Sequence, residues 1–136
     1  MTSIVPWTIE EDIELIMRFL EYGFQEKDGK HKRNAATKKK IFETIGQVMP
    51  LRTHSALEVR WYSSIEVDIL RGRMKRFGLS HVSVPIDPFQ DITFALEVKA
   101  EEVKEIDQKR LEKGKSRELE LILDFPNLFF HIFLIY

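Results

Sequence analysis

Apolar residues recur at helical spacing near the start of the chain and predict a helix that begins after Thr8. They lie at positions i, i+3, i+4, i+7 and i+11 and comprise Ile13, Ile16, Met17, Leu20 and Phe24. Thr8 followed three residues later by Glu11 is a capping-box pattern, in which each side chain accepts a hydrogen bond from the other residue's backbone amide. Trp7, directly before this cap, is expected to pack under the helix as a hydrophobic staple.

A second apolar stripe predicts a short buried helix that ends at Pro50. Its cap is Asn34 or Thr37, both of which have the side-chain oxygen that favours a helix start. The stripe comprises Ile41, Phe42, Ile45, Val48 and Met49. Three lysines, at positions 38–40, are expected on the solvent side of this helix.

The third predicted helix, over residues 53–68, is the stretch around which the chain is organised. Its buried face is expected to comprise Leu57, Trp61, Ser64 and Ile65. Either Thr53 or Ser55 caps it, and Ser55 with Glu58 forms another capping-box pattern. The outward face carries His54, Glu58, Val59 and Tyr62. Two short helices joined by a proline-marked turn are typical of a helix-turn-helix unit.

A cluster of cations without an intervening acid follows this helix, after Ile69 and Leu70 have continued its apolar register. The cluster comprises Arg71, Arg73, Lys75 and Arg76. One interpretation is a helix end, where cations favour the negative end of the helix dipole. The other is a basic arm that follows the recognition helix and binds phosphates.

The later part of the chain predicts a linker with two prolines and further helices. Asp87 is expected to cap a helix with Pro88 at its first position. A short apolar stripe follows, comprising Phe89, Ile92, Thr93 and Leu96. Residues 100–113 predict a separate, mostly solvated helix, and both helices should pack on the first three because their own apolar surface is small. The apolar tail over residues 116–136 is either a segment that covers the core or an unrelated end from an alternative transcript.

Charge is unevenly distributed along a chain whose formal net charge is -1. Residues 1–80 hold 14 basic against 11 acidic residues, or +3, and residues 81–136 hold 7 against 11, or -4. Residues 25–40, predicted to be a polar loop, contribute seven basic and two acidic residues to the first part. This loop is either a solvated segment or a patch that contacts phosphates, since clustered cations bind polyanions through counterion release.

Several function classes are not expected from these residues. The chain has no cysteine, which excludes disulfides, thiolate metal sites and a cysteine nucleophile. The four histidines lack ligand spacing, and no phosphate-binding loop, nucleophile elbow or zinc-protease motif is present. We therefore expect a non-enzyme without metal, cofactor or small-molecule substrate. The start lacks the plan of a secretory signal and no run suits a membrane span, which favours the nucleus or cytoplasm.

Two motifs carry a family resemblance. WTIEED at residues 7–12 and RTHSALEVRWYSSI at residues 52–65 together resemble the Myb/SANT family of three-helix modules. The longer pattern that continues through PFQDITFALEVKAEEV at residues 88–103 is similar to the nematode SPK-domain family. The resemblance implies a nuclear module associated with DNA or chromatin. It also implies an all-α fold: a three-helix Myb/SANT-like helix-turn-helix unit over residues 6–70, a basic arm with packed C-terminal helices over residues 71–115, and an apolar tail over residues 116–136.

Two functional hypotheses follow for the third helix. In the first, the helix enters the major groove of DNA and its outward residues face bases or sugars, namely His54, Ser55, Val59 and Tyr62. Phosphates would be held by the flanking cations Lys38, Lys39, Lys40, Arg52, Arg71, Arg73, Lys75 and Arg76. Against this hypothesis, Glu58 lies on the outward face, where a reader of guanine would carry arginine or lysine. Arg60 is expected to pair with Glu11 or Glu14 instead of DNA.

In the second hypothesis, the same three helices bind a histone tail or another chromatin protein. Acidic residues on the outward face suit a basic peptide, and the near-neutral net charge suits it too. A third hypothesis is that the apolar tail makes the chain an oligomer and that assembly is its role.

Overall fold

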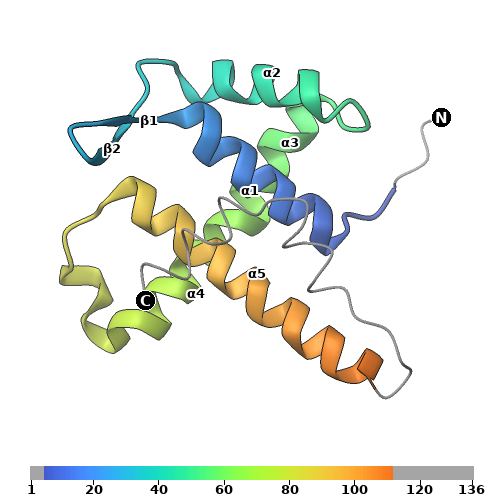
Figure 1. Ribbon diagram of the computed structural model, residues 1–136, viewed down its shortest axis with the longest axis vertical. Coiled ribbons are helices and arrows are strands. Elements are labelled where there is room, and N and C mark those ends of the chain that lie inside the picture. The colour runs from blue at the N-terminus through green and yellow to red at the C-terminus, as the bar shows by residue number, and fades with distance from the viewer. Residues whose placement is uncertain (1–4, 112–136) are drawn as a thin grey trace.

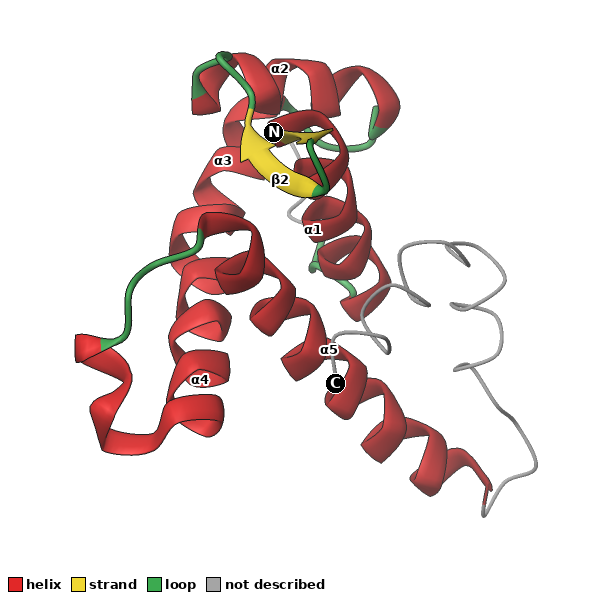
Figure 2. Cartoon of the chain, turned by 60° about the vertical axis from the view of Figure 1, so that its left-hand side comes forward, coloured by secondary structure: helices red, strands yellow, loops and turns green. Residues whose placement is uncertain are grey.

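The part of the chain that the structure describes is mostly helical. A computed structural model describes residues 5–111, so the predicted tail over residues 116–136 and its covering or oligomerising role lie outside the described residues. The elements are α1 (Ile9–Gly23), β1 (Phe24–Lys27), β2 (Lys30–Arg33), α2 (Lys38–Val48), α3 (His54–Arg60), a π-helical turn (Trp61–Ile65), α4 (Glu66–Phe77), a 3-10 helix (Gly78–Ser83) and α5 (Pro88–Leu111). A small two-stranded sheet joins the expected helices (Figure 2).

Helix α1 lies between two groups of helices. Figure 1 shows α2 and α3 packed together at one end of the molecule, and α4 with α5 at the other. The capping box predicted at its start is present, with the Glu11 amide 3.2 Å from Thr8 Oγ1 and the Thr8 amide 3.2 Å from Glu11 Oε1. The predicted stripe is buried, and Leu15 and Phe19 are buried as well because α2 and α5 cover α1 from different sides.

A β-hairpin replaces the first part of the predicted polar loop. Strands β1 and β2 pair antiparallel, with Phe24 opposite Arg33. The connecting residues Asp28 and Gly29 both have positive φ, 55° and 74°, which is the backbone that a two-residue hairpin turn requires. The His31 ring stacks on the Phe89 ring of α5 at 3.8 Å between centroids. The hairpin is therefore held against the start of α5.

Helices α2 and α3 begin at threonine caps. Thr37 Oγ1 accepts a hydrogen bond from the Lys40 amide, and Thr53 Oγ1 accepts one from the Ala56 amide. The cap of α3 is therefore Thr53, and the alternative start at Ser55 is wrong. The predicted buried residues of α2 are confirmed except Val48, which is 40% exposed. Threonine is a suitable cap for both helices because its side-chain oxygen accepts a hydrogen bond from a first-turn amide that has no acceptor within the helix.

Helix α3 continues through the π turn into α4 without an intervening loop. The cations of residues 71–76 therefore lie in a helix that ends at Phe77, with Lys75 and Arg76 in its last turn, which confirms the first interpretation, a helix end, and not a separate arm. Leu57, Trp61 and Ile65 are buried as predicted, and Trp61 stacks on Phe19 at 4.1 Å. Ile69 packs against the core as expected, whereas Leu70 is 58% exposed and does not continue the apolar register.

Helix α5 is one helix where the sequence predicted two. Asp87 Oδ1 accepts hydrogen bonds from the amides of Phe89 and Gln90, which confirms the predicted start. The predicted stripe is buried and Val103 is buried further along, so α5 contributes to the same core as α1, α2 and α3. Across the helices that the structure describes, none is both long enough and apolar enough to cross a bilayer.

Candidate interaction surface

The outward side of α3 and α4 carries a row of exposed apolar side chains, which we call the apolar stripe. Their exposed fractions range from 46% to 66%, and the stripe comprises Val59, Tyr62, Val67, Leu70 and Met74. No element within residues 5–111 covers them. Monomeric proteins scatter single apolar residues over the surface, whereas a continuous apolar patch marks an interaction site.

The π turn aligns the two halves of the stripe. Glu66 donates its amide to the Trp61 carbonyl, which places one extra residue in this turn. Val67 lies eight positions after Val59, which is more than two turns of a regular α-helix. Because the π turn holds one extra residue, these eight positions span about two turns here. Val67 therefore returns to the side of Val59. π turns of this kind occur frequently at functional sites.

The polar groups around the α3 half of the stripe are mainly acids and hydroxyls, whereas the exposed cations Arg71 and Lys75 belong to its α4 half. Ser55, Glu58 and Ser63 line a shallow hollow together with Val59 and Tyr62. His54 and Ser55 are exposed, as predicted for an outward face. The α3 half of this face can contact apolar groups and accept hydrogen bonds, but it offers few donors to base edges.

One lysine of α2 reaches this face. Lys38 Nζ lies 3.8 Å from a Glu66 carboxylate oxygen and 5.4 Å from the centre of the Tyr62 ring. Partial burial raises the pKa of Tyr62, and the negative charges of Glu58 and Glu66 raise it further. Tyr62 is therefore a neutral hydroxyl at neutral pH, placed between one cation and two carboxylates.

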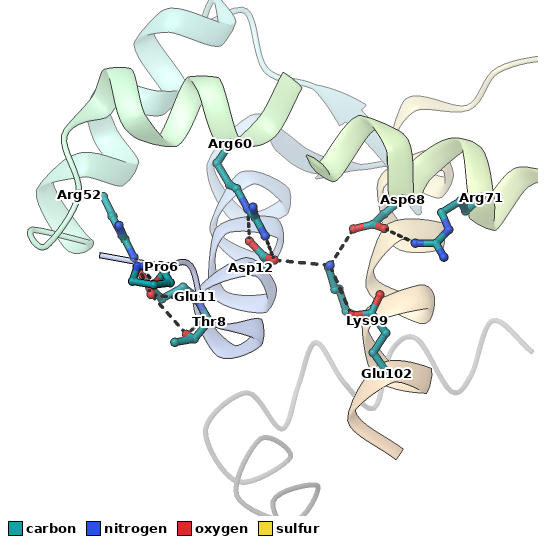
Figure 3. Close-up of polar contacts among 10 residues, drawn as sticks. All are labelled: Pro6, Thr8, Glu11, Asp12, Arg52, Arg60, Asp68, Arg71, Lys99 and Glu102. Atoms are coloured by element: carbon teal, nitrogen blue, oxygen red, sulfur yellow. Dashed lines mark hydrogen bonds and ion pairs between the residues drawn. The ribbon is translucent and has the colours of Figure 1, made fainter. Parts of the chain in front are cut away.

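Arg52, a predicted phosphate contact, is bound to acceptors of the protein itself. Its guanidinium donates to the Glu11 carboxylate at 2.7 and 2.9 Å and to the Pro6 carbonyl oxygen (Figure 3), and it also donates to the carbonyl oxygen of Val5. It also lies 4.4 Å from the centre of the Trp7 ring. The hydrogen bond from Arg52 lowers the pKa of Glu11 below its ordinary value. Arg52 thus fixes the segment before α1 to the start of α3, and four of its five N–H donors are used.

Arg73, another predicted phosphate contact, is buried, and only 7% of it is exposed. Its guanidinium donates to Asp91 at 3.0 and 3.1 Å and to the carbonyl oxygens of His81 and Val84. The prediction of a surface role for Arg73 is wrong, because its guanidinium is buried between α4, α5 and their connection, where it pairs with Asp91 and donates to two carbonyls.

The other predicted cations remain at the surface. Arg71 lies 3.6 Å from Asp68, and Lys75 pairs with Glu101 of α5. Arg76 is exposed. Lys39 and Lys40 are exposed on the first turn of α2, and neither pairs with a carboxylate in the described part of the chain. The structure therefore separates the twelve predicted site residues into four groups. These are the outward face with Lys38, the exposed pair Lys39 and Lys40, three surface cations of α4 (Arg71, Lys75 and Arg76), and two arginines bound to acceptors of the protein itself (Arg52 and Arg73).

A buried ionic network connects α1, α3, α4 and α5. Asp12 accepts two hydrogen bonds from Arg60, at 2.6 and 2.8 Å, so the predicted pair of Arg60 with Glu11 or Glu14 is wrong. Lys99 Nζ lies 2.9 Å from Asp68, 3.5 Å from Asp12 and 3.6 Å from Glu102 (Figure 3). Burial works to lower the pKa of Lys99, but contact with Asp68 and the neighbouring carboxylates outweighs it, and the pKa is raised.

Sequence reasoning missed this network, although a signal was present. Lys99 lies three residues after Leu96 in the register of the buried α5 stripe, and Asp68 lies three residues after Ile65 in that of the preceding helix. A charged residue in the register of an apolar stripe is a candidate for a buried pair. Within residues 5–111, no three histidine, aspartate or glutamate side chains gather in a way that would hold a metal ion.

Comparison of the chain with models of protein families, with curated proteins and with solved structures found no match.

Proposed function

We propose that this chain is a protein-interaction module of the Myb/SANT kind, nuclear and associated with chromatin, in which α1, α2 and α3 form the three-helix unit. The observation that carries the proposal is the apolar stripe, whose residues are 46–66% exposed along one face of consecutive helices. Burying such a row against a partner removes apolar surface from water, which favours association. The chromatin setting rests on the family resemblance of the sequence.

The chemistry of the outward face favours a protein partner over DNA bases. Specific base reading depends on arginine, lysine, asparagine or glutamine donors in the groove. The outward residues of α3 supply instead a glutamate, a valine, a tyrosine and serines, namely Glu58, Val59, Tyr62, Ser55 and Ser63. Arg52 and Arg73 are bound to internal carboxylates and carbonyls. A partner that presents apolar groups with nearby cations, such as a histone tail, matches this face.

A binding experiment with paired substitutions tests the proposal. We would measure the binding of the full chain to an array of histone-tail peptides, and repeat it with Val59→Ser combined with Val67→Ser. The matched control is Leu79→Ser, because Leu79 is 92% exposed but lies outside the stripe. We expect the double variant to lose binding and the control to retain it. Equal binding by the unchanged chain, the double variant and the control would refute the apolar stripe as the binding surface. If the unchanged chain binds no tail, histone tails are excluded as the partner.

A second candidate function is contact with the nucleic-acid backbone through the lysines of α2 and the hairpin. Lys39 and Lys40 are exposed on the first turn of α2, where the helix dipole makes lysines unfavourable. Lys30 and Lys32 are exposed on the adjacent strand β2. A polyanion at this position would offset the repulsion, and the contact would be independent of base sequence.

Fluorescence anisotropy of a labelled random duplex tests this second candidate. Backbone contact predicts that log K falls with log salt at a slope of about -0.9 per phosphate contacted. Lys39→Glu with Lys40→Glu should weaken binding on every duplex, whereas Lys104→Glu with Lys109→Glu on α5 makes the same charge change elsewhere. Equal binding by the two double variants would remove the α2 lysines from the proposal.

A further inference from the structure

A pocket of about 420 Å³ opens between the hairpin, the start of α2, α4 and the start of α5. Its floor is apolar and comprises Phe19, Phe24, Trp61, Ile69 and Ile92. Two apolar residues at its mouth, Leu70 and Ile86, are 58% and 69% exposed. Pockets that bind ligands are commonly of this size, with apolar walls and a few polar groups that fix orientation.

Arg33 of β2 is the polar group that distinguishes this pocket. Its Nη1 donates to the Gly23 carbonyl at 3.0 Å, and its guanidinium carbon lies 5.3 Å from the centre of the Phe24 ring and 5.6 Å from that of Phe19. A guanidinium carries five N–H donors, and the Gly23 carbonyl uses one of them. Within residues 5–111, no carboxylate oxygen forms an ion pair with Arg33. Arg18, Arg52, Arg60 and Arg73 each have such a partner.

The other charged groups that line the pocket are matched with each other or with neighbours. Asp91 is paired with Arg73, and Glu66 lies 3.8 Å from Lys38. The charge of Arg33 is therefore left without an opposite charge beside aromatic rings. A carboxylate forms the strongest complement to a guanidinium, through two parallel hydrogen bonds. The pocket thus combines an apolar space with a site for a carboxylate.

We infer that this pocket receives a large apolar side chain of a partner protein, and that Arg33 binds an aspartate or glutamate of the same partner segment. Leu70 belongs both to the mouth of the pocket and to the apolar stripe, so a partner that covers the stripe reaches the pocket. The exposed mouth residues match a protein segment, which covers the surroundings of an anchor as well as the anchor itself. The inference rests on the proposed interaction function, and it adds the acidic and apolar chemistry of the anchoring segment.

Peptide selection on the full chain tests the inference. Randomised nine-residue peptides displayed on phage would be selected against residues 1–136, and the selected peptides would be synthesised and measured by fluorescence anisotropy. We expect them to share a large apolar residue with an aspartate or glutamate within two positions. Changing that acid to its amide should weaken binding by roughly tenfold, the effect of about 1.4 kcal/mol.

Two variants assign the effect to Arg33. Arg33→Gln keeps a donor for the Gly23 carbonyl and should weaken binding by a similar factor, while becoming insensitive to the acid-to-amide change in the peptide. Arg33→Lys keeps the charge without the planar fork and should bind with intermediate affinity. Circular dichroism of both variants confirms that they remain folded, and the amide form of the peptide tests the pairing on the unchanged protein.

The remaining outcomes separate this inference from the proposed function. Peptides that lose binding to Val59→Ser with Val67→Ser, but bind Arg33→Gln as they bind the unchanged chain, would overturn the pocket and keep the stripe. Peptides whose binding is weakened by Arg33→Gln but not by Val59→Ser with Val67→Ser would support the pocket as the binding site and overturn the role of the apolar stripe. A selected set that lacks an aspartate or glutamate near its large apolar residue, whatever cations it carries, or an empty set, would overturn the anchoring role of Arg33.

Discussion

Removal of the buried ammonium group by Lys99→Met should strongly destabilise the fold. Lys99 and Asp68 are 7% and 3% exposed, so the substitution leaves the Asp68 carboxylate buried without its nearest cation. Asp12 retains both hydrogen bonds from Arg60, and the loss therefore falls mainly on Asp68. Breaking a buried pair from one side costs about 3–5 kcal/mol. Exposed Arg71, 3.6 Å away, offsets about 1 kcal/mol at most, so we expect about 3 kcal/mol.

Urea unfolding followed by circular dichroism and tryptophan fluorescence measures this loss. With a slope of about 1.5–2 kcal/mol per molar urea, a loss of about 3 kcal/mol lowers the midpoint by roughly 1.5–2 M. The control Lys109→Met removes an exposed lysine from the same helix and should change stability by less than about 0.5 kcal/mol. Adding Asp68→Asn to Lys99→Met should recover part of the loss, because no buried carboxylate is then unpaired. A midpoint shift equal to that of the control would refute the buried network as a source of stability.

Three further predictions concern the core and the start of the fold. Gly72→Ala should destabilise by about 1–3 kcal/mol in urea unfolding, because its Cβ would lie 2.5 Å from the Phe94 Cβ and 2.8 Å from the Phe94 carbonyl oxygen. Gly46→Ala, whose Cβ meets nothing closer than 3.6 Å, should instead gain up to about 1 kcal/mol from helix propensity; equal effects would contradict the close approach of α4 and α5. Trp61→Ala should cost about 3–5 kcal/mol, and an unchanged circular dichroism melting curve would show that this ring does not hold the core. Folding lowers the pKa of Glu11, so the stabilisation that its carboxylate contributes is present above its ordinary pKa of 4.5 and is lost as the pH falls below that value. Glu11→Gln should therefore reduce the pH dependence of stability in acid unfolding curves. Parallel curves for the variant and the unchanged chain would contradict the pairing of Glu11 with Arg52.

Local patterns in the sequence determined most of the helix starts and buried stripes. The Thr8 and Glu11 capping box and the Asp87 start form as predicted, since a cap depends on residues within one helical turn. The buried stripe of α1 is also confirmed, because its spacing follows from the helical repeat alone. These features required no knowledge of distant residues.

The hairpin and the length of the later helices were not predictable in the same way. Apart from Phe24, the strands of the hairpin are polar and show no apolar alternation in sequence, so the local signal for the hairpin was the Asp28-Gly29 turn. Helix α4 extends to Phe77 because Arg73 and Gly72 are enclosed by α5 and the 78–87 connection, which the isolated segment does not reveal.

The candidate interaction surface likewise contains residues whose positions the sequence predicted and residues whose roles only the tertiary structure decided. The outward positions of Val59 and Tyr62 follow from the helical repeat, and their exposure was predictable from sequence. The availability of the cations was decided only by tertiary structure, since the anions that hold Arg52 and Arg73 come from α1 and α5. A charged side chain carries no local mark of whether its partner will be solvent, a distant carboxylate or another molecule. Its role depends on which groups folding brings within a few ångströms, because the strength of an ion pair is set by distance and burial.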